Sequence, residues 1–136
     1  MCKSIIWNQL QSFFSNSLIS EGCIINAKAI KKSVIGNRSR IGEGTVIENS
    51  YIMGNDFYQS LTDMKEDIEN ENQLIGIGER CYINHALVDK NCRIGNDVYI
   101  NGGKHLTNCS EELYCIKDGI VVIKKGKTLP DNFRIE

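Results

Sequence analysis

The sequence has few of the residues that large globular cores are usually built from. It holds a single proline, Pro130, and aromatic residues make up 7% of its 136 residues. No apolar run approaches the roughly 20 residues of a membrane-spanning helix, and residues 1–17 lack the basic start, apolar centre and cleavage site of a signal peptide. We therefore expect no membrane partner, and a fold of many short, similar strands rather than one large aromatic core.

No charge of either sign dominates. The net charge is −1, with 24% charged and 41% hydrophobic residues. This balance gives no reason to expect nucleic acid or an anionic membrane as a partner. The length suits one domain with a sizeable core.

The chain also lacks paired metal-ligand motifs. No two cysteines form a CxxC pair, and His85 and His105 do not complete a zinc-ligand spacing, so we expect no metal site. We favour reduced, buried thiols in a cytoplasmic protein, or in the plastid stroma if the source is a plant or alga. The even number of cysteines also allows a disulfide framework. The six are Cys2, Cys23, Cys81, Cys92, Cys109 and Cys115.

What the sequence does contain is a repeat. Aliphatic residues recur in steps of five or six residues, which is typical of a parallel β-helix in which three short strands close each triangular coil. Ile19, Ile35 and Ile52 are expected on one face in successive coils, about 4.8 Å apart. The first block reads ISEGCI, INAKA, IKKSV, IGNRSR, IGEGTV and IENSY; the second reads IGERCY, INHAL, VDKNCR and IGNDVY; a looser third runs through Ile116, Ile123, Leu129 and Ile135.

Two further positions of the repeat carry structural expectations. The fifth position should hold a small inward residue, as at Cys23, Ala29, Ser39, Thr45, Cys81 and Cys92. Glycine at the second position is expected to give tight corners their backbone freedom; these glycines are Gly36, Gly42, Gly78 and Gly95. The left hand of the β-helix is expected from resemblance to hexapeptide-repeat proteins.

Residues 18–136 are expected to form the β-helix domain, with insertions at 54–74 and 102–113. In the first insertion, Ser60 and Asp63 suggest the start of a short helix near 60–71 that packs on the outside. Residues 1–17 are expected to cap the first coil, because open β-helix ends expose strand edges. Helical spacing of apolar residues there favours a capping helix; they are Ile6, Leu10, Phe13 and Phe14.

Three segments carry a more specific resemblance. Residues 33–60 (SVIGNRSRIGEGTVIENSYIMGNDFYQS), 75–95 (IGIGERCYINHALVDKNCRIG) and 116–131 (IKDGIVVIKKGKTLPD) closely resemble the C-terminal domain of ADP-glucose pyrophosphorylase, also called glucose-1-phosphate adenylyltransferase, of the plant and cyanobacterial type. The resemblance covers about residue 17 to the end and includes the MGNDFYQS insertion.

The resemblance implies a non-catalytic role. The family makes ADP-glucose and pyrophosphate from ATP and glucose 1-phosphate, for glycogen or starch, in a separate Mg²⁺-dependent nucleotidyltransferase domain. That domain has no counterpart in this sequence, so we expect neither a catalytic site nor a cofactor here, and the chain is expected to be inactive alone. The expected partners are the catalytic domain, in cis or in trans, and other subunits of a tetramer. Phosphorylated effectors are the expected ligands, bound by the lysines that match the family's activator site, Lys90 and Lys125.

Two other functions stay open. A hexapeptide-repeat acyltransferase would use a histidine between subunits as a general base, and His85 is the candidate. A stand-alone structural β-helix would bind no small molecule. Arg38 and Arg40 are expected either to face the absent domain or to form surface ion pairs.

Overall fold

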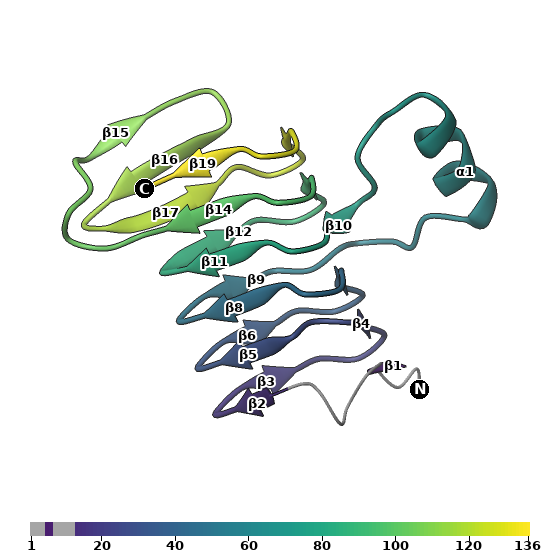
Figure 1. Cartoon of the computed structure of the whole chain (residues 1–136), viewed down its shortest axis with the longest axis horizontal. Coiled ribbons are helices and arrows are strands. Elements are labelled where there is room, and N and C mark those ends of the chain that lie inside the picture. The colour runs from purple at the N-terminus through teal and green to yellow at the C-terminus, as the bar shows by residue number, and fades with distance from the viewer. Residues whose placement is uncertain (1–4, 7–12) are drawn as a thin grey trace.

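The computed structural model describes residues 5–6 and 13–136. The chain winds as a parallel β-helix whose coils stack three sheets into a triangular prism (Figure 1). Sheet A contains β1 (Ile5–Ile6), β4 (Ile24–Ile25), β7 (Arg40–Ile41), β10 (Gly76–Ile77), β13 (Arg93–Ile94) and β18 (Thr128–Leu129). Sheet B contains β2 (Phe13–Ser15), β5 (Ala29–Lys31), β8 (Val46–Glu48), β11 (Tyr82–Asn84), β14 (Tyr99–Asn101) and β19 (Arg134–Ile135). Sheet C contains β3 (Leu18–Ile19), β6 (Val34–Ile35), β9 (Tyr51–Ile52), β12 (Ala86–Val88), β17 (Ile120–Ile123), β16 (Tyr114–Lys117) and β15 (Cys109–Ser110).

The interior is a set of aliphatic columns, as the repeat predicts. Ile19 pairs with Ile35, and Ile35 with Ile52, in consecutive strands of sheet C. Each coil thus places one aliphatic side chain per sheet in the core, and burying such a side chain stabilises the fold by about 1.5–3 kcal/mol. The third block holds in part: Ile123, Leu129 and Ile135 continue the parallel ladder, whereas Ile116 is buried but lies in the antiparallel strand β16.

Small residues line the inner corners of the prism. Five of the six expected ones point inward and are at most 3% exposed: Cys23, Ser39, Thr45, Cys81 and Cys92. Ala29 is the exception. It is buried, but it lies beside Ile30 on the outward-facing row of sheet B, between Phe13 and Val46. The five-residue step before it leaves Ala27, which is fully buried, as the small residue of that corner.

Buried hydroxyl groups join successive coils at the corner between sheets B and C. The Ser33 hydroxyl donates to the carbonyl of Lys31 at 2.8 Å and accepts from the amide of Ser50 at 3.2 Å. Ser50 repeats the pattern, donating to Glu48 at 2.6 Å and accepting from Ala86 at 3.2 Å. These hydroxyls satisfy backbone groups that the corner removes from the sheet ladder.

The second-position glycines serve a different purpose from the one expected. Gly36, Gly42, Gly78 and Gly95 are not among the residues with positive φ. A Cβ atom at Gly42 would lie 2.5 Å from the carbonyl oxygen of Gly78 in the next coil. Glycine is therefore required for the close approach of stacked backbones.

The capping helix expected at the N-terminus does not form in the described part of residues 1–17. Ile5–Ile6 is a strand that pairs with Ile24–Ile25, and Phe13–Ser15 pairs with Ala29–Lys31. The available edges of sheets A and B satisfy backbone hydrogen bonds here, and this outweighs the helical spacing of the apolar residues. Leu10 and the rest of that expectation lie outside the described residues.

The C-terminal end departs from the parallel pattern. β15, β16 and β17 are antiparallel, with Cys115 opposite Val122 in the β16–β17 pair. The resulting hairpin lies across the last coil (Figure 1), where Tyr114 packs edge-on against Phe133. The insertion expected at 102–113 contains β15 and so supplies the first strand of this antiparallel structure.

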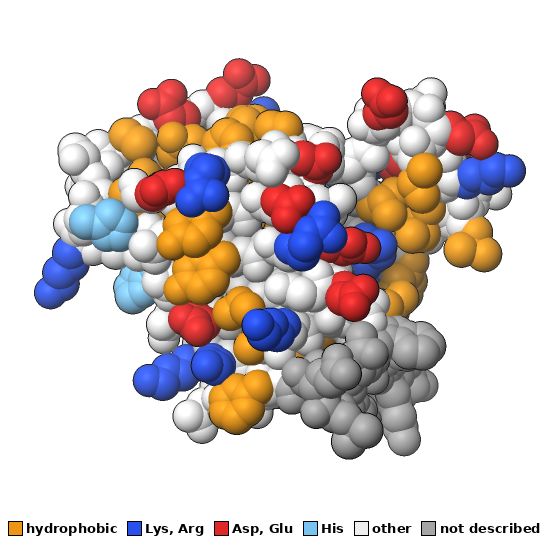
Figure 2. Space-filling model, viewed as in Figure 1, with side chains coloured by type: hydrophobic (Ala, Val, Ile, Leu, Met, Phe, Trp, Pro, Cys, Tyr) orange, Lys and Arg blue, Asp and Glu red, His pale blue; other side chains and the backbone are white. Residues whose placement is uncertain are grey.

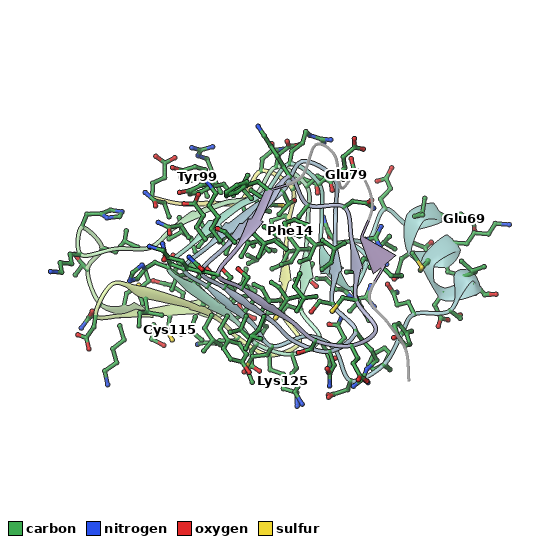
Figure 3. The ribbon with its side chains drawn as sticks, turned by 90° about the horizontal axis from the view of Figure 1, so that it is seen from below. Phe14, Glu69, Glu79, Tyr99, Cys115 and Lys125 are labelled. Carbon is green, nitrogen blue, oxygen red and sulfur yellow. The ribbon has the colours of Figure 1, made fainter. Side chains whose placement is uncertain are left out.

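The insertion at 54–74 leaves the prism at one corner and carries helix α1 (Leu61–Glu69), which lies outside the triangular cross-section (Figure 3). The expected cap is present, because the Ser60 hydroxyl accepts from the amide of Asp63 at 3.1 Å. The packing of α1 differs from the expectation: Leu61 is 86% exposed and Ile68 63% exposed, so most of the apolar side of α1 faces solvent. No helix in the described part of the chain is long and apolar enough to cross a membrane.

Candidate anion-binding edge

Lys90 and Lys125 lie in adjacent coils on one edge of the prism. Lys90 follows β12 and Lys125 follows β17, and these strands pair in register with Val88 opposite Ile123. The two corners therefore overlie, and the amide of Gly126 donates to the carbonyl of Lys90 at 2.9 Å. Figure 3 shows Lys125 at the outer margin of the ribbon, away from the interior. The fold thus brings the two predicted site residues together.

A carboxylate from the insertion faces both lysines. Asp56 accepts from Lys90 Nζ at 3.1 Å and from Asn91 Nδ2 at 3.0 Å. The amide of Asp56 in turn donates to Asn91 Oδ1 at 2.9 Å. The hydrogen bonds from Asn91 and Lys90, with the nearby charge of Lys125, lower the pKa of Asp56. The carboxylate of Asp56 thus faces two ammonium groups, and the carboxylate of Asp89 lies at the same corner, where it accepts from the amide of Lys90 at 2.7 Å.

The neighbouring lysine, Lys124, is engaged elsewhere. Its ammonium group donates to the carbonyl of Glu111 in the C-terminal hairpin. Lys125 is exposed and acts on Asp56 through its charge. The lysine pair of this edge is therefore Lys90 and Lys125.

Sequence reasoning did not find Asp56 or Asn91. Asp56 and Asn91 are 35 residues apart, across the insertion. The repeat pattern could place Asp56 near Lys90 only with knowledge of how the strand before the insertion pairs with the strand after it. The pairing of Ile52 with Val88 is the feature that would have indicated this contact, because it aligns the corners that follow the two strands.

Of the other residues singled out in the sequence, Cys92 lies beside this edge, where its thiol donates to the carbonyl of Lys124 at 3.2 Å. His85 is exposed at the corner between sheets B and C, where its carbonyl accepts from the amide of Val121 at 3.2 Å. Cys23, Cys81 and Cys92 are buried, as expected for small core residues. In the described part of the chain, no group of three or more His, Cys, Asp or Glu side chains is placed to hold a metal ion.

Arg38 and Arg40, whose roles the sequence did not decide, differ in their contacts. Arg38 donates from Nε to the carbonyl of Asn55 at 2.9 Å, and Asn55 donates back from Nδ2 to the carbonyl of Arg38 at 2.9 Å. This reciprocal pair holds the start of the insertion against the coil below it. Arg40 is half-buried on the outer side of sheet A and makes no such bond within the described residues.

Comparison with known proteins agrees with this architecture. Residues 8–133 match the model of the GLGC left-handed parallel beta-helix domain. The chain is 40% identical over 123 residues to the chloroplastic/amyloplastic glucose-1-phosphate adenylyltransferase small subunit of Triticum aestivum, covering 89% of this chain and 26% of that protein. It is 36% identical over 126 residues to an inactive glucose-1-phosphate adenylyltransferase small subunit 2, chloroplastic, of Arabidopsis thaliana, covering 87% and 26%.

These matches extend over nearly all of the chain but only about a quarter of the relatives. They confirm the left hand of the β-helix and the resemblance inferred from the three sequence segments. The chain therefore belongs to the GLGC left-handed parallel β-helix domain family.

Proposed function

We propose that this chain is the regulatory and assembly domain of a glucose-1-phosphate adenylyltransferase. In this proposal a nucleotidyltransferase domain, in cis or in trans, joins ATP and glucose 1-phosphate into ADP-glucose and pyrophosphate. That domain also holds the Mg²⁺ of the reaction. The β-helix contacts the catalytic domain and other subunits of a tetramer, in the plastid stroma if the source is a plant or alga and in the cytoplasm otherwise. The names of the wheat and Arabidopsis relatives support the assignment.

The observation that carries the regulatory part is the placement of Lys90 and Lys125 over one carboxylate. Two ammonium groups on one edge match the charge of a phosphate dianion better than that of Asp56, whose carboxylate bears a single charge. Charge-assisted hydrogen bonds to phosphate oxygens are about twice as strong as neutral ones. A phosphorylated effector would therefore take the place of Asp56 between the lysines.

Displacement of Asp56 gives such a site a means of regulation. Asp56 belongs to the insertion, and Asn55 beside it is bonded to Arg38. An effector that breaks the contact between Asp56 and Lys90 releases one attachment of the insertion. Effector binding would then change the position of the insertion, and with it the contact between the insertion and a neighbouring domain or subunit. The proposed site needs further cationic groups from the catalytic domain for high affinity, because Lys90 and Asp56 are both nearly half exposed.

The test is reconstitution with a catalytic domain of the family. The variant Lys90→Ala/Lys125→Ala should lose most of its response to 3-phosphoglycerate or a hexose bisphosphate, measured as ADP-glucose formation against effector concentration. Lys65→Ala, which changes an exposed lysine on α1, is the matched control and should respond as the unmodified chain does. An unchanged response in the double variant would overturn the regulatory proposal. Sedimentation of the reconstituted enzyme with and without the β-helix tests the assembly role.

A further inference from the structure

Arg40 is the one arginine of the described chain whose guanidinium has no acceptor. The other four each bond to one: Arg38 to Asn55, Arg80 to Asp97, Arg93 to Asp67 and Arg134 to Glu136. Arg40 is half-buried, and this burial lowers its pKa even though Glu79 lies near enough to act in the opposite direction. A guanidinium has five N–H donors, and those of Arg40 reach solvent, because no buried side-chain polar atom of the described residues lacks a hydrogen-bond partner. These donors are therefore available to an anion that the chain itself does not supply.

The backbone leaves room for this side chain. Arg40 lies on the outer face of sheet A, with Ile24 on the neighbouring strand below and Gly76 at the corresponding place above. A Cβ atom at Gly76 would lie 2.9 Å from Cβ of Arg40. Glycine at position 76 therefore leaves room for the backbone and Cβ of Arg40, with which any larger residue would collide.

A cavity of about 80 Å³ opens between Arg40 and the first part of the insertion. Arg38 and Arg40 are its cationic lining residues, and it has no Asp or Glu among its lining residues. The hydroxyl of Tyr58 closes one side by donating to the carbonyl of Gly22 at 3.0 Å. The rest of the wall is largely apolar, from Ile24, Phe57, Met64 and Ile75. Figure 2 shows apolar side chains gathered where the insertion meets the body of the β-helix.

A second, larger cavity of about 670 Å³ also borders Arg40. Its lining includes the carboxylates Glu71, Glu79 and Asp131, which would repel an anion. Of these two cavities, the smaller one beside Phe57 is therefore electrostatically more favourable for an anion that binds Arg40.

We propose that this smaller cavity binds a small organic anion, a carboxylate or phosphate monoester that carries an aromatic ring or a short alkyl chain. The planar guanidinium of Arg40 receives the two oxygens of the anionic group in bidentate fashion. The apolar part of the ligand lies between Phe57, Met64 and Ile75. A volume of about 80 Å³ holds several water molecules, so the cavity encloses the polar end of the ligand and the first atoms of its apolar part.

This site differs in character from the edge formed by Lys90 and Lys125. The lysine edge is exposed, already holds Asp56, and attracts ligands by charge alone. The Arg40 cavity adds apolar walls, so affinity there depends on the body of the ligand as well as on its charge. The proposal goes beyond the proposed regulatory function and does not require it.

The test uses the 136-residue chain and three probes: phenyl phosphate, benzoate and inorganic phosphate. Amide chemical shifts in two-dimensional NMR spectra report both affinity and location. We expect phenyl phosphate or benzoate to shift amides of residues 38–40 and 57–64, and to bind more tightly than inorganic phosphate. Comparison of phenyl phosphate with benzoate decides whether the phosphate ester or the carboxylate is the preferred anion.

Variants separate this site from general attraction of anions. Arg40→Gln should weaken binding of the preferred aromatic probe by more than about tenfold, as expected for loss of a bidentate charged contact. Arg134→Gln, which removes an exposed arginine whose ion-pair partner is Glu136, should leave binding unchanged. Phe57→Ala should weaken aromatic probes but not inorganic phosphate. Arg40→Lys keeps the charge and provides a folded comparison if Arg40→Gln is unstable.

Three results would overturn the proposal. The first is that no aromatic probe binds the unmodified chain. The second is that Arg40→Gln and Arg40→Lys both bind as tightly as the unmodified chain. The third is that binding is lost in Lys90→Ala and kept in Arg40→Gln, which would locate the anion at the lysine edge instead.

Discussion

The carboxylate of Asp67 lies 2.6 Å from the guanidinium of Arg93, so an ion pair ties helix α1 to the outer face of sheet A. Gln59 donates to the same carboxylate at 2.6 Å, and Arg93 also donates to the carbonyl of Gln73 at 2.8 Å. Both ends of the insertion therefore meet at this pair. Most of the apolar surface of α1 is exposed, and these polar contacts replace the apolar packing that usually holds a helix on a sheet.

We predict that the attachment of α1 weakens in acid. The hydrogen bond from Arg93, followed by that from Gln59, lowers the pKa of Asp67. A carboxyl group with a lowered folded-state pKa stabilises the attached state above its ordinary pKa of about 4, and this contribution is lost as the pH falls through the lowered value. Amide hydrogen exchange of residues 59–74 should therefore accelerate, relative to the β-helix core, below about pH 4.

The variant Asp67→Asn should show this faster exchange already at neutral pH. Glu69→Gln on the same helix, an exposed position, is the control and should exchange as the unmodified chain does. If Asp67→Asn protects residues 59–74 as well as the unmodified chain at neutral pH, the ion pair does not hold the insertion.

Ser33→Ala should destabilise the fold through a lost hydrogen bond rather than a lost apolar contact. The substitution removes the acceptor of the buried Ser50 amide, and an unsatisfied buried donor costs about 1–3 kcal/mol. Urea unfolding followed by circular dichroism measures the free energy of unfolding. Ser110→Ala, at an exposed position, should change it by less than about 0.5 kcal/mol. Equal effects at the two positions would contradict the role assigned to the hydroxyl.

Gly42→Ala should disturb the stacking of coils. The new methyl group would lie 2.5 Å from the Gly78 carbonyl oxygen, so two backbones must separate, at a cost of about 1–3 kcal/mol. Gly126→Ala is the informative comparison, because nothing lies within 4 Å of its Cβ position although its φ is +71°. It should cost about 1 kcal/mol, from conformation alone. A smaller loss of stability for Gly42→Ala than for Gly126→Ala in thermal unfolding would disprove the steric explanation.

Alkylation should discriminate among the cysteines. Burial raises the pKa of the Cys92 thiol to about 11, so little thiolate is present near neutral pH. Cys109 is exposed. Iodoacetamide at about pH 8 should therefore modify Cys109 well before Cys92, as followed by peptide mass spectrometry. In urea the two rates should become similar, and equal rates in the folded chain would show that Cys92 is accessible.

The columns of the prism could be predicted because each inward aliphatic residue repeats a local pattern. Ile19, Ile35 and Ile52 are found on one face from their spacing alone, and the Ser60 cap of α1 from a four-residue motif. Family resemblance added Lys90 and Lys125, whose juxtaposition the coil stacking accounts for. These features could be predicted because they depend on residues that are close in sequence or separated by a whole number of coils.

The remaining features depend on contacts that no local pattern encodes. Asp56 reaches Lys90 only because the insertion returns the chain to the correct register. Ile5–Ile6 form a strand because a free sheet edge lies beside them, although their spacing favours a helix. Glycine is required at position 42 because the backbone of the next coil lies close to it, and this contact is distant in sequence. The cavity beside Arg40 is created by the path of the insertion, which the sequence does not specify.

The insertion leaves the stack and rejoins it without changing the partners of any strand. Ser50 bonds to Ala86, 36 residues ahead, in the same way that Ser33 bonds to Ser50, 17 residues ahead. A corner of the prism therefore has insertional tolerance: the length of its loop is free to change during evolution while the columns stay intact. New recognition surfaces can be acquired there by lengthening or exchanging one loop, and divergence among proteins of this architecture should concentrate at such corners rather than along the strands.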